Sequence, residues 1–112
     1  MWYHSKYVMK EINTQEAEKI IATGSATPID VRTDDEYNEG HIKGCLHIDI
    51  ASPDFLSRIA ALTKDQAYLI YCAAGGRSSR ATQMMTQAGF TNATNLVGGF
   101  TGWRKAGLPE EK

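Results

Sequence analysis

The sequence has no long apolar run and no excess of charge of one sign. A membrane helix needs roughly 20 consecutive apolar residues, and the first residues also lack the apolar centre of a signal peptide. We therefore expect a cytoplasmic protein with no membrane partner, or a periplasmic one if a signal peptide has been removed. The 12 basic and 13 acidic residues are spread along the chain, so no basic stripe is available to bind nucleic acid.

Cysteine is also scarce, since Cys45 and Cys72 are the only two. They could form one disulfide at most, which excludes the dense disulfide framework of small secreted proteins. No C-x-x-C motif occurs, and the histidines show no paired spacing typical of zinc ligands. The sequence therefore predicts no metal and no other cofactor.

The composition is that of an ordinary globular protein. Hydrophobic residues make up 42% of the 112 residues and charged residues 22%, a balance that is not typical of disordered chains. A chain of this length can form one hydrophobic core without metal or disulfide staples. We expect a single monomeric domain over residues 1–112, with its core within about 7–109.

Helix signals alternate with short apolar runs along the chain. Two capping boxes, at residues 13–16 and 33–36, predict helices that end at Gly24 and Gly40. The short apolar runs predict strands. These strands are expected at residues 7–9, 27–31, 46–48, 68–71 and 94–97.

Three further helices complete the alternation. Proline at the first helical position indicates a helix from Ser52-Pro53, a last short helix contains Trp103, and Gly89 ends a helix at 81–88. The apolar stripe of the helix after Pro53 is expected to be Phe55, Leu56, Ile59 and Leu62. Strands that alternate with helices predict an α/β fold whose mainly parallel sheet is covered on both faces. Its binding site should lie at the carboxyl ends of the strands.

Cys72 directly follows the most apolar predicted strand and precedes an amphipathic helix. The four residues between Cys72 and Arg77 are Ala-Ala-Gly-Gly, which have little bulk and include two positions free to adopt positive φ. Such a loop can curl until successive backbone N–H groups converge on one point at a helix N-terminus. The sequence therefore predicts an anion-binding nest after Cys72.

This nest would favour a thiolate on Cys72, because the N–H groups, the helix dipole and Arg77 all stabilise negative charge. A free cysteine has a pKa of about 8.5, whereas cysteines at helix termini fall to roughly 3.5–7.5. The commonest fate of a free cysteine is burial as a small apolar residue. The Gly-Gly-Arg that opens the following helix favours a reactive thiol instead.

Other chemically capable residues are interpreted as structural. Cys45 lies in an apolar context and is expected to fill the core, with a resolving thiol as the alternative role. His41 and His47 could act as general bases, but lone histidines beside glycines are more often hydrogen-bonded structural residues. Asp30 and Arg32 end a predicted buried strand, and we expect an ion pair or loop brace because buried charges persist mainly when they are paired.

Four stretches of the sequence together resemble single-domain rhodaneses, over about residues 13–109. Any one of these stretches is weak evidence, whereas four in order at the family's spacing make a specific signature. They are Ile29–Arg32, then Glu36-Tyr37 with Gly40–Gly44, then Cys72–Ser78, and finally Leu96–Phe100 with Trp103 and Gly107–Pro109.

The resemblance implies a five-stranded, mainly parallel sheet flanked by helices, and the activity of a thiosulfate sulfurtransferase. Cys72 would be the catalytic nucleophile, which takes a sulfane sulfur from a small anionic donor such as thiosulfate and holds it as a persulfide. The acceptor would be cyanide, a thiol or a sulfur-accepting protein. The residues expected to bind the anion are Ala73, Ala74, Gly75, Gly76, Arg77 and Ser78, with Asp30 and Arg32 in support.

Two other functions share parts of this pattern. Cysteine phosphatases and arsenate reductases of similar fold use C-x5-R, whereas the spacing here is C-x4-R and position 78 is serine. The shorter loop should be too tight for a phosphate. A rhodanese-like domain can also be a non-catalytic docking module or a relay that hands a persulfide to one partner. Retention of Cys72 with an intact loop favours chemistry, and the relay stays open.

Overall fold

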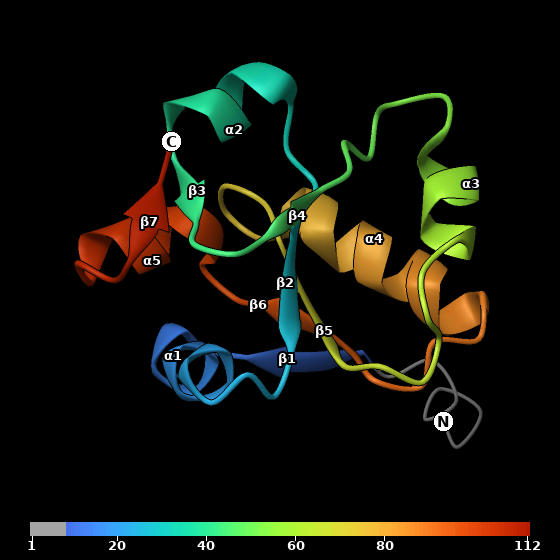
Figure 1. Cartoon of the computed structure of the whole chain (residues 1–112), viewed down its shortest axis with the longest axis horizontal. Coiled ribbons are helices and arrows are strands. Elements are labelled where there is room, and N and C mark those ends of the chain that lie inside the picture. The colour runs from blue at the N-terminus through green and yellow to red at the C-terminus, as the bar shows by residue number, and fades with distance from the viewer. Residues whose placement is uncertain (1–8) are drawn as a thin grey trace.

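A five-stranded parallel sheet forms the centre of the molecule (Figure 1), in a computed structural model that describes residues 9–112. The strand order is β1-β6-β5-β2-β4, and all four neighbouring pairs are parallel. The predicted α/β class and the five-stranded sheet are therefore confirmed. The strands are β1 (Lys10–Ile12), β2 (Thr27–Asp30), β4 (Leu46–His47), β5 (Tyr68–Tyr71) and β6 (Ala93–Leu96).

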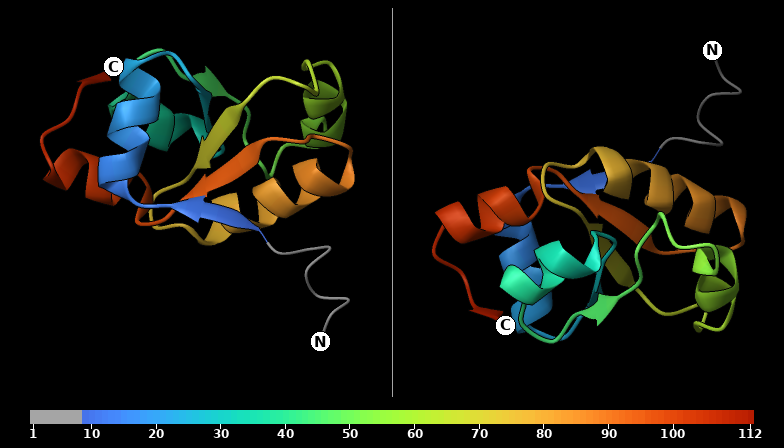
Figure 2. Two further views of the ribbon diagram at one scale, coloured as in Figure 1. Left: turned by 90° about the horizontal axis from the view of Figure 1, so that it is seen from below. Right: turned by 90° about the horizontal axis from the view of Figure 1, so that it is seen from above.

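Helices connect these strands and cover both faces of the sheet (Figure 2). α3 and α4 pack on one face, whereas α1 and α5 pack on the other. No helix in residues 9–112 combines the length and the apolar composition that crossing a membrane requires. The helices are α1 (Thr14–Ala22), α2 (Asp34–Glu39), α3 (Phe55–Ala60), α4 (Gly76–Gln87) and α5 (Gly99–Lys105).

The two faces of β5 supply the two hydrophobic cores. Tyr68 and Ile70 point into the core beneath α3 and α4, and Leu69 and Tyr71 point into the core beneath α1 and α5. This alternation follows the period of two of a strand buried on both faces. Cys72 continues the first set, so its side chain belongs to the core beneath α4.

Both predicted capping boxes are present. The Asn13 side chain accepts a hydrogen bond from the amide of Glu16 at 2.9 Å, and Thr33 Oγ1 accepts one from the amide of Glu36 at 3.3 Å. In each pair the glutamate carboxylate accepts the reciprocal bond from the cap residue's amide. These local signals therefore set the starts of α1 and α2.

Several predicted boundaries shift in the structure. Of the extended segment expected at 7–9, Tyr7 and Val8 lie outside the described residues, and β1 begins only at Lys10. The last parallel strand ends at Leu96, and Val97 lies in an exposed turn. The position at which a strand begins or ends depends on the length of the neighbouring strand, which the residues around that position do not indicate.

The prediction for α3 was wrong in two respects. Pro53 does not occupy the first helical position, because α3 begins at Phe55 after Asp54 as N-cap. Leu56 is 61% exposed, although it was assigned to the apolar stripe. A helix of six residues packs through a single i, i+4 pair, which is Phe55 with Ile59, so Leu56 points away from the sheet.

A two-stranded antiparallel ribbon was not predicted. β3 (His41–Ile42) pairs with β7 (Glu110–Glu111), which brings the C-terminal segment beside α2 and β3 (Figure 1). Trp103 Nε1 anchors this segment by donating a hydrogen bond to the Pro109 carbonyl at 2.9 Å. Two-residue strands that pair across nearly 70 positions leave no periodic signal in a sequence.

Candidate active site

Cys72 lies at the carboxyl end of β5, the central strand of the sheet, where the chain turns into α4. Its residue exposure is only 1%. Gly75 is the N-cap of α4 and has a φ of 114°, a conformation that glycine adopts without steric cost. The predicted strand–loop–helix setting of the cysteine is therefore present.

Hydrogen-bond donors of the loop converge on the sulfur atom. The Gly75 amide lies 3.1 Å from Cys72 Sγ, and Ser78 Oγ lies 3.4 Å from it. The Ser78 hydroxyl is also 3.2 Å from the Gly75 carbonyl oxygen, so its one proton can serve either acceptor. Ser78 is fully buried, which keeps water from competing for the sulfur.

These donors lower the pKa of the Cys72 thiol. Burial alone would raise that pKa, because it disfavours the charged form. Hydrogen bonds from the Ser78 hydroxyl and from the amides of Ser78, Gly75 and Ala74 outweigh burial, so the pKa lies below its ordinary value. Ser78 was among the residues expected to form the anion-binding loop, and both its hydroxyl and its amide contribute to this shift.

The N-terminus of α5 fixes the other side of the loop. The Phe100 amide donates to the Cys72 carbonyl at 2.8 Å, and the Thr101 amide donates to the Ala73 carbonyl at 3.1 Å. In a trans peptide the C=O and the following N–H point in opposite directions. The carbonyls of Cys72 and Ala73 point towards α5, so the amides of Ala73 and Ala74 point away from it. The Ala74 amide is one of those that hydrogen-bond to Cys72.

This contact depends on Gly99, whose role the sequence did not reveal. Gly99 has a φ of 55°, and a Cβ added there would lie 2.6 Å from the Ala73 carbonyl oxygen and closer still to that of Cys72. Both conditions favour glycine. The Gly98-Gly99 pair was the available signal, but nothing local showed that the cysteine loop packs against it.

Arg77 is paired with a carboxylate of α2. Its Nη1 and Nη2 atoms donate to Glu36 Oε1 and Oε2 at 2.8 and 3.0 Å, a two-pronged ion pair. Glu36 chiefly raises the pKa of Arg77, with smaller contributions from Cys72 and Asp49. The sequence predicted that Arg77 would face the sulfur and its donor. It assigned Glu36 to a capping box and to one of the rhodanese-like stretches, with no contact to the cysteine loop.

The same pair governs the charge of Glu36. The hydrogen bond from Arg77, helped by donors of Thr33, overcomes burial and lowers the pKa of Glu36 to about 2. Glu36 is therefore ionised at any physiological pH. The two partners stand 41 positions apart, so no local pattern joins them.

Asp30 and Arg32 form the expected ion pair beneath the site. Arg32 Nη2 lies 2.7 Å from Asp30 Oδ2, and Tyr71 donates its hydroxyl to the same oxygen at 2.8 Å. The Arg32 guanidinium also lies 4.5 Å above the Phe100 ring. Through Phe100, the pair supports the α5 end that holds the Cys72 carbonyl, and it makes no hydrogen bond to Cys72 among the described residues.

The two described histidines stack on opposite faces of Tyr37. Ring centroids are 3.8 Å apart for His41 and 4.2 Å apart for His47. His41 Nδ1 lies 2.8 Å from the Tyr37 carbonyl oxygen, and His47 Nε2 lies 2.8 Å from that of Arg32. Carbonyls only accept, so these ring nitrogens carry the protons. The contacts agree with a structural interpretation of both histidines.

Cys45 and Cys72 are free thiols that pack on opposite faces of the sheet. Cys45 is half-buried against the core beneath α1 and α5, where the Tyr71 hydroxyl lies 3.4 Å from its sulfur. Burial raises the pKa of the Cys45 thiol to about 11. It therefore stays protonated, as expected of a packing residue.

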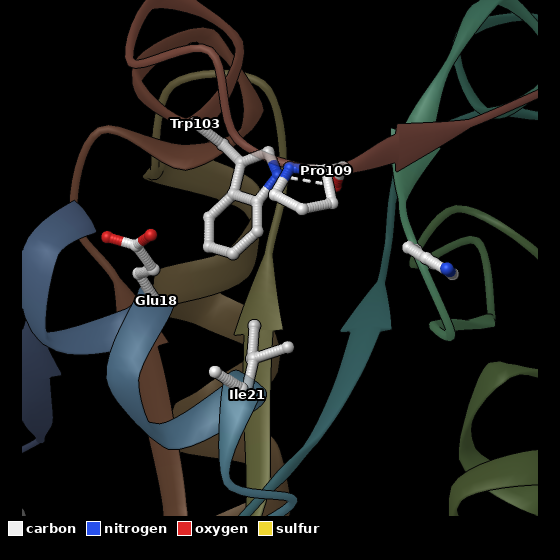
Figure 3. A pocket seen from close by; sticks show the side chains of 6 residues that line it. Glu18, Ile21, Trp103 and Pro109 are labelled. Carbon is white, nitrogen blue, oxygen red and sulfur yellow. Dashed lines mark hydrogen bonds between the residues drawn. The ribbon is translucent and has the colours of Figure 1, made fainter.

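A separate hollow of about 410 Å³ lies between α1 and the C-terminal segment (Figure 3). Trp103 and Pro109, joined by their hydrogen bond, form one wall, and Glu18 and Ile21 form another. None of its six described lining residues belongs to the cysteine loop.

Within residues 9–112, no three His, Cys, Asp or Glu side chains gather closely enough to hold a metal ion.

Residues 13–106 match the family model described as the rhodanese-like domain. The chain belongs to the rhodanese-like family. The sequence resemblance is confirmed by this match, which covers the loop and both elements that hold it, α2 and α5. The family includes proteins named sulfurtransferases.

Several known proteins resemble the chain over most of its length. It is 33% identical to the thiosulfate sulfurtransferase GlpE of Coxiella burnetii, covering 85% of this chain and 87% of that protein. It is 31% identical to the Arabidopsis thaliana mitochondrial protein HIGH ARSENIC CONTENT 1, covering 93% and 67%. The crystal structure of a rhodanese-related protein from Thermoplasma volcanium superposes with a TM-score of 0.83 at 28% identity, covering 91% and 97%.

Proposed function

We propose that this rhodanese-like protein is a sulfurtransferase that carries sulfane sulfur as a persulfide on Cys72. The observation that carries the proposal is the convergence of the Gly75 amide and the Ser78 hydroxyl on Cys72 Sγ, at 3.1 and 3.4 Å. A thiolate is the nucleophile that sulfur transfer requires. Relatives named thiosulfate sulfurtransferase support the same reaction class.

In the first half-reaction the Cys72 thiolate attacks the outer sulfur of the donor. A bond forms between Cys72 Sγ and that sulfur, the donor's S–S bond breaks, and the leaving group departs with the electron pair. With thiosulfate the leaving group is sulfite, and the total charge of −3 is the same before and after the step. The loop amides then hold the anionic outer sulfur of the persulfide.

In the second half-reaction a thiophilic acceptor attacks the outer sulfur. The persulfide S–S bond breaks, and its electron pair returns to Cys72 as the thiolate. Cyanide leaves as thiocyanate, and a thiol leaves as a hydropersulfide. The donors that lower the pKa of Cys72 make its thiolate a good leaving group, so the same loop serves both steps.

Intact-mass spectrometry tests the proposal directly. The protein is treated with thiosulfate, and separately with methanethiosulfonate and a low-molecular-weight hydropersulfide. We expect a gain of one sulfur, about 32 Da, which is lost in Cys72→Ser and retained in Cys45→Ser. Absence of the gain with every donor would favour the non-catalytic docking module.

A relay function differs only in its acceptor. A relay would load Cys72 normally but discharge it slowly to cyanide and small thiols, and quickly to one protein. We propose the general sulfurtransferase and expect release of thiocyanate from the loaded protein on addition of cyanide. Persistence of the added mass in excess cyanide would favour the relay.

Phosphatase and arsenate reductase activities are expected to be slower than sulfur transfer. The Gly75 amide already lies in contact with Cys72 Sγ, and the loop has one residue fewer than C-x5-R. A tetrahedral oxyanion needs a wider ring of amides than a single sulfur atom does. Aryl phosphate hydrolysis, or arsenite formation from arsenate and a thiol, faster than sulfur transfer from any of the three donors would reverse this choice.

A further inference from the structure

Residues 73–77 of the cysteine loop include one cation, Arg77, and a carboxylate already pairs with it. Residues 73–76 carry no charged side chain, and Arg77 follows them. Both terminal nitrogens of Arg77 are bonded to the two oxygens of Glu36. Asp49 is a second carboxylate close enough to act on Arg77. An incoming anion therefore meets the amides of the nest but no uncompensated positive charge from the loop.

Glu36 is held in place more firmly than an ordinary surface carboxylate. Its Oε1 atom accepts hydrogen bonds from the amide and the hydroxyl of Thr33 at 3.1 and 3.0 Å, which fix it at the start of α2. The Arg77 side chain is 40% exposed and that of Glu36 is 33% exposed, so a donor in solution can reach the pair. Cys72 is close enough to act on the charge of Arg77, and Arg77 can turn towards a donor on Cys72 only by giving up its bonds to Glu36, which would leave that carboxylate unpaired.

We propose that Glu36 is a specificity-determining residue that disfavours dianionic sulfur donors, so that the preferred donors are singly charged sulfane compounds such as hydropersulfides and organic thiosulfonates. This inference rests on the proposed function. The amides of the nest can stabilise one negative charge on a donor. A second negative charge would be repelled by the fixed carboxylate of Glu36, and repulsion between like charges is a recognised source of selectivity.

The preferred reaction balances without a further reagent. The Cys72 thiolate attacks the outer sulfur of a hydropersulfide anion, the donor's S–S bond breaks, and a thiolate leaves with the electron pair. The total charge of −2 is unchanged. With an organic thiosulfonate the leaving group is a sulfinate. Both leaving groups carry one charge, whereas thiosulfate releases sulfite, a dianion.

The substitution Glu36→Gln removes the negative charge and keeps the fold. Glutamine serves as well as glutamate at the third position of a capping box, so the bonds with Thr33 are retained. Glu39→Gln is the matched control, because it makes the same chemical change on the same helix. Glu39 is exposed, and no described hydrogen bond or ion pair involves its side chain.

The experiment compares thiosulfate with methanethiosulfonate, which offers the same outer sulfur with one charge fewer. The rate at which Cys72 gains sulfur is measured with each donor, and the ratio of the two rates is compared between variants. We expect Glu36→Gln to raise the thiosulfate-to-methanethiosulfonate ratio about tenfold, and Glu39→Gln to leave it at the wild-type value. If Glu36 had a purely structural role, Glu36→Gln would change both rates by the same factor and leave their ratio unchanged.

Salt gives a second readout. Screening weakens charge repulsion at the exposed mouth, so the wild-type ratio should rise with ionic strength and that of Glu36→Gln should rise less. An unchanged ratio in Glu36→Gln, with Cys72 loaded by both donors, would overturn this inference and leave the sulfurtransferase intact. Failure of all donors to load the wild-type protein would overturn the proposed function, and the inference with it.

Discussion

The Phe100 amide at the start of α5 donates a hydrogen bond to the Cys72 carbonyl oxygen at 2.8 Å. The cysteine loop is therefore held from outside by a second helix, in addition to the helix that it opens. Thr101 repeats the contact with Ala73 at 3.1 Å. These two bonds set the peptide planes of the loop, so the direction of its amides depends on how closely α5 approaches.

Gly99→Ala should disrupt this approach. The added Cβ would lie 2.6 Å from the Ala73 carbonyl oxygen, at a residue with a φ of 55°. Overpacking and backbone strain together should lower the free energy of unfolding by about 2–4 kcal/mol. The reaction of Cys72 with iodoacetamide should slow, because the amides diverge from the sulfur.

Gly107→Ala is the control for this change. Gly107 lies just beyond the other end of α5 with a φ of 72°, and a Cβ there would meet nothing within 4 Å. It should cost about 1 kcal/mol of stability and leave the alkylation rate of Cys72 unchanged. Equal alkylation rates in both variants would show that α5 does not set the loop geometry.

Ser78→Ala should shift the alkylation profile of Cys72 to higher pH. The Ser78 hydroxyl is the largest of the contributions that lower the pKa of this thiol. A hydrogen bond to a charged group contributes about 1.5–3 kcal/mol, so the alkylation rate below the thiol pKa should fall roughly tenfold or more. The rate of iodoacetamide labelling, measured by mass across a pH series, gives the shift.

Ser79→Ala is the matched control, since Ser79 is the next residue of α4 and its hydroxyl makes no described hydrogen bond except a weak one to Met9 Sδ at 3.6 Å. Its profile should follow that of the wild-type protein. A wild-type labelling rate that rises only above the ordinary thiol pKa would contradict the nest itself.

The sequence predicted those parts of the site that are local in the chain. The capping boxes at Asn13 and Thr33, the strand that leads into Cys72 and the glycine turn at Gly75 are all confirmed, since each depends on residues within a few positions. Burial of β5 on both faces was likewise visible as a continuous apolar run.

The long-range contacts around the cysteine loop were not predictable in this way. Glu36 with Arg77, and Gly99 with Cys72, join segments that are 41 and 27 positions apart, and each residue alone has an ordinary local role. The exposure of Leu56 shows the same limit in the core. Its type and position suit an apolar stripe, yet the short α3 presents only one row of side chains to the sheet.

Tyr71→Phe should destabilise the fold from beneath the site. The Tyr71 hydroxyl donates to Asp30 Oδ2 at 2.8 Å and accepts from the Ile42 amide at 3.0 Å. Its removal leaves the buried Ile42 amide without an acceptor, whereas Asp30 Oδ2 keeps its bond from Arg32 Nη2 at 2.7 Å. We expect a loss of about 1–3 kcal/mol, read as a lower urea midpoint with an unchanged slope.

Tyr68→Phe on the same strand is the comparison. Its hydroxyl makes its nearer hydrogen bond, at 3.0 Å, to the Thr63 carbonyl in a partly buried position, so its loss should cost less than about 1 kcal/mol. A smaller loss for Tyr71→Phe than for Tyr68→Phe would contradict the bracing role of the Asp30 network.

Cys45 should take no part in the reactions of Cys72. The two thiols pack on opposite faces of the sheet, and burial raises the pKa of Cys45 to about 11. Peptide mapping after brief iodoacetamide treatment at neutral pH should find Cys72 labelled and Cys45 unlabelled. Mild oxidation should yield no disulfide between them, and a Cys45–Cys72 peptide pair under native conditions would show that the sheet opens.

Glu36→Gln should reduce stability at neutral pH by an amount that disappears in acid. The pKa of Glu36 is lowered in the fold from 4.5 to about 2, so the ionised carboxylate stabilises the folded state above 4.5 and that stabilisation is lost as the pH falls towards 2. The difference in Tm between wild type and Glu36→Gln should therefore shrink over this range. The pair is partly exposed, so the effect at neutral pH should stay below about 1 kcal/mol and weaken with salt.

Glu39→Gln is the control, and its difference in Tm from the wild type should not change over this pH range. A difference in Tm for Glu36→Gln that is constant with pH would mean that the ion pair with Arg77 does not form in solution.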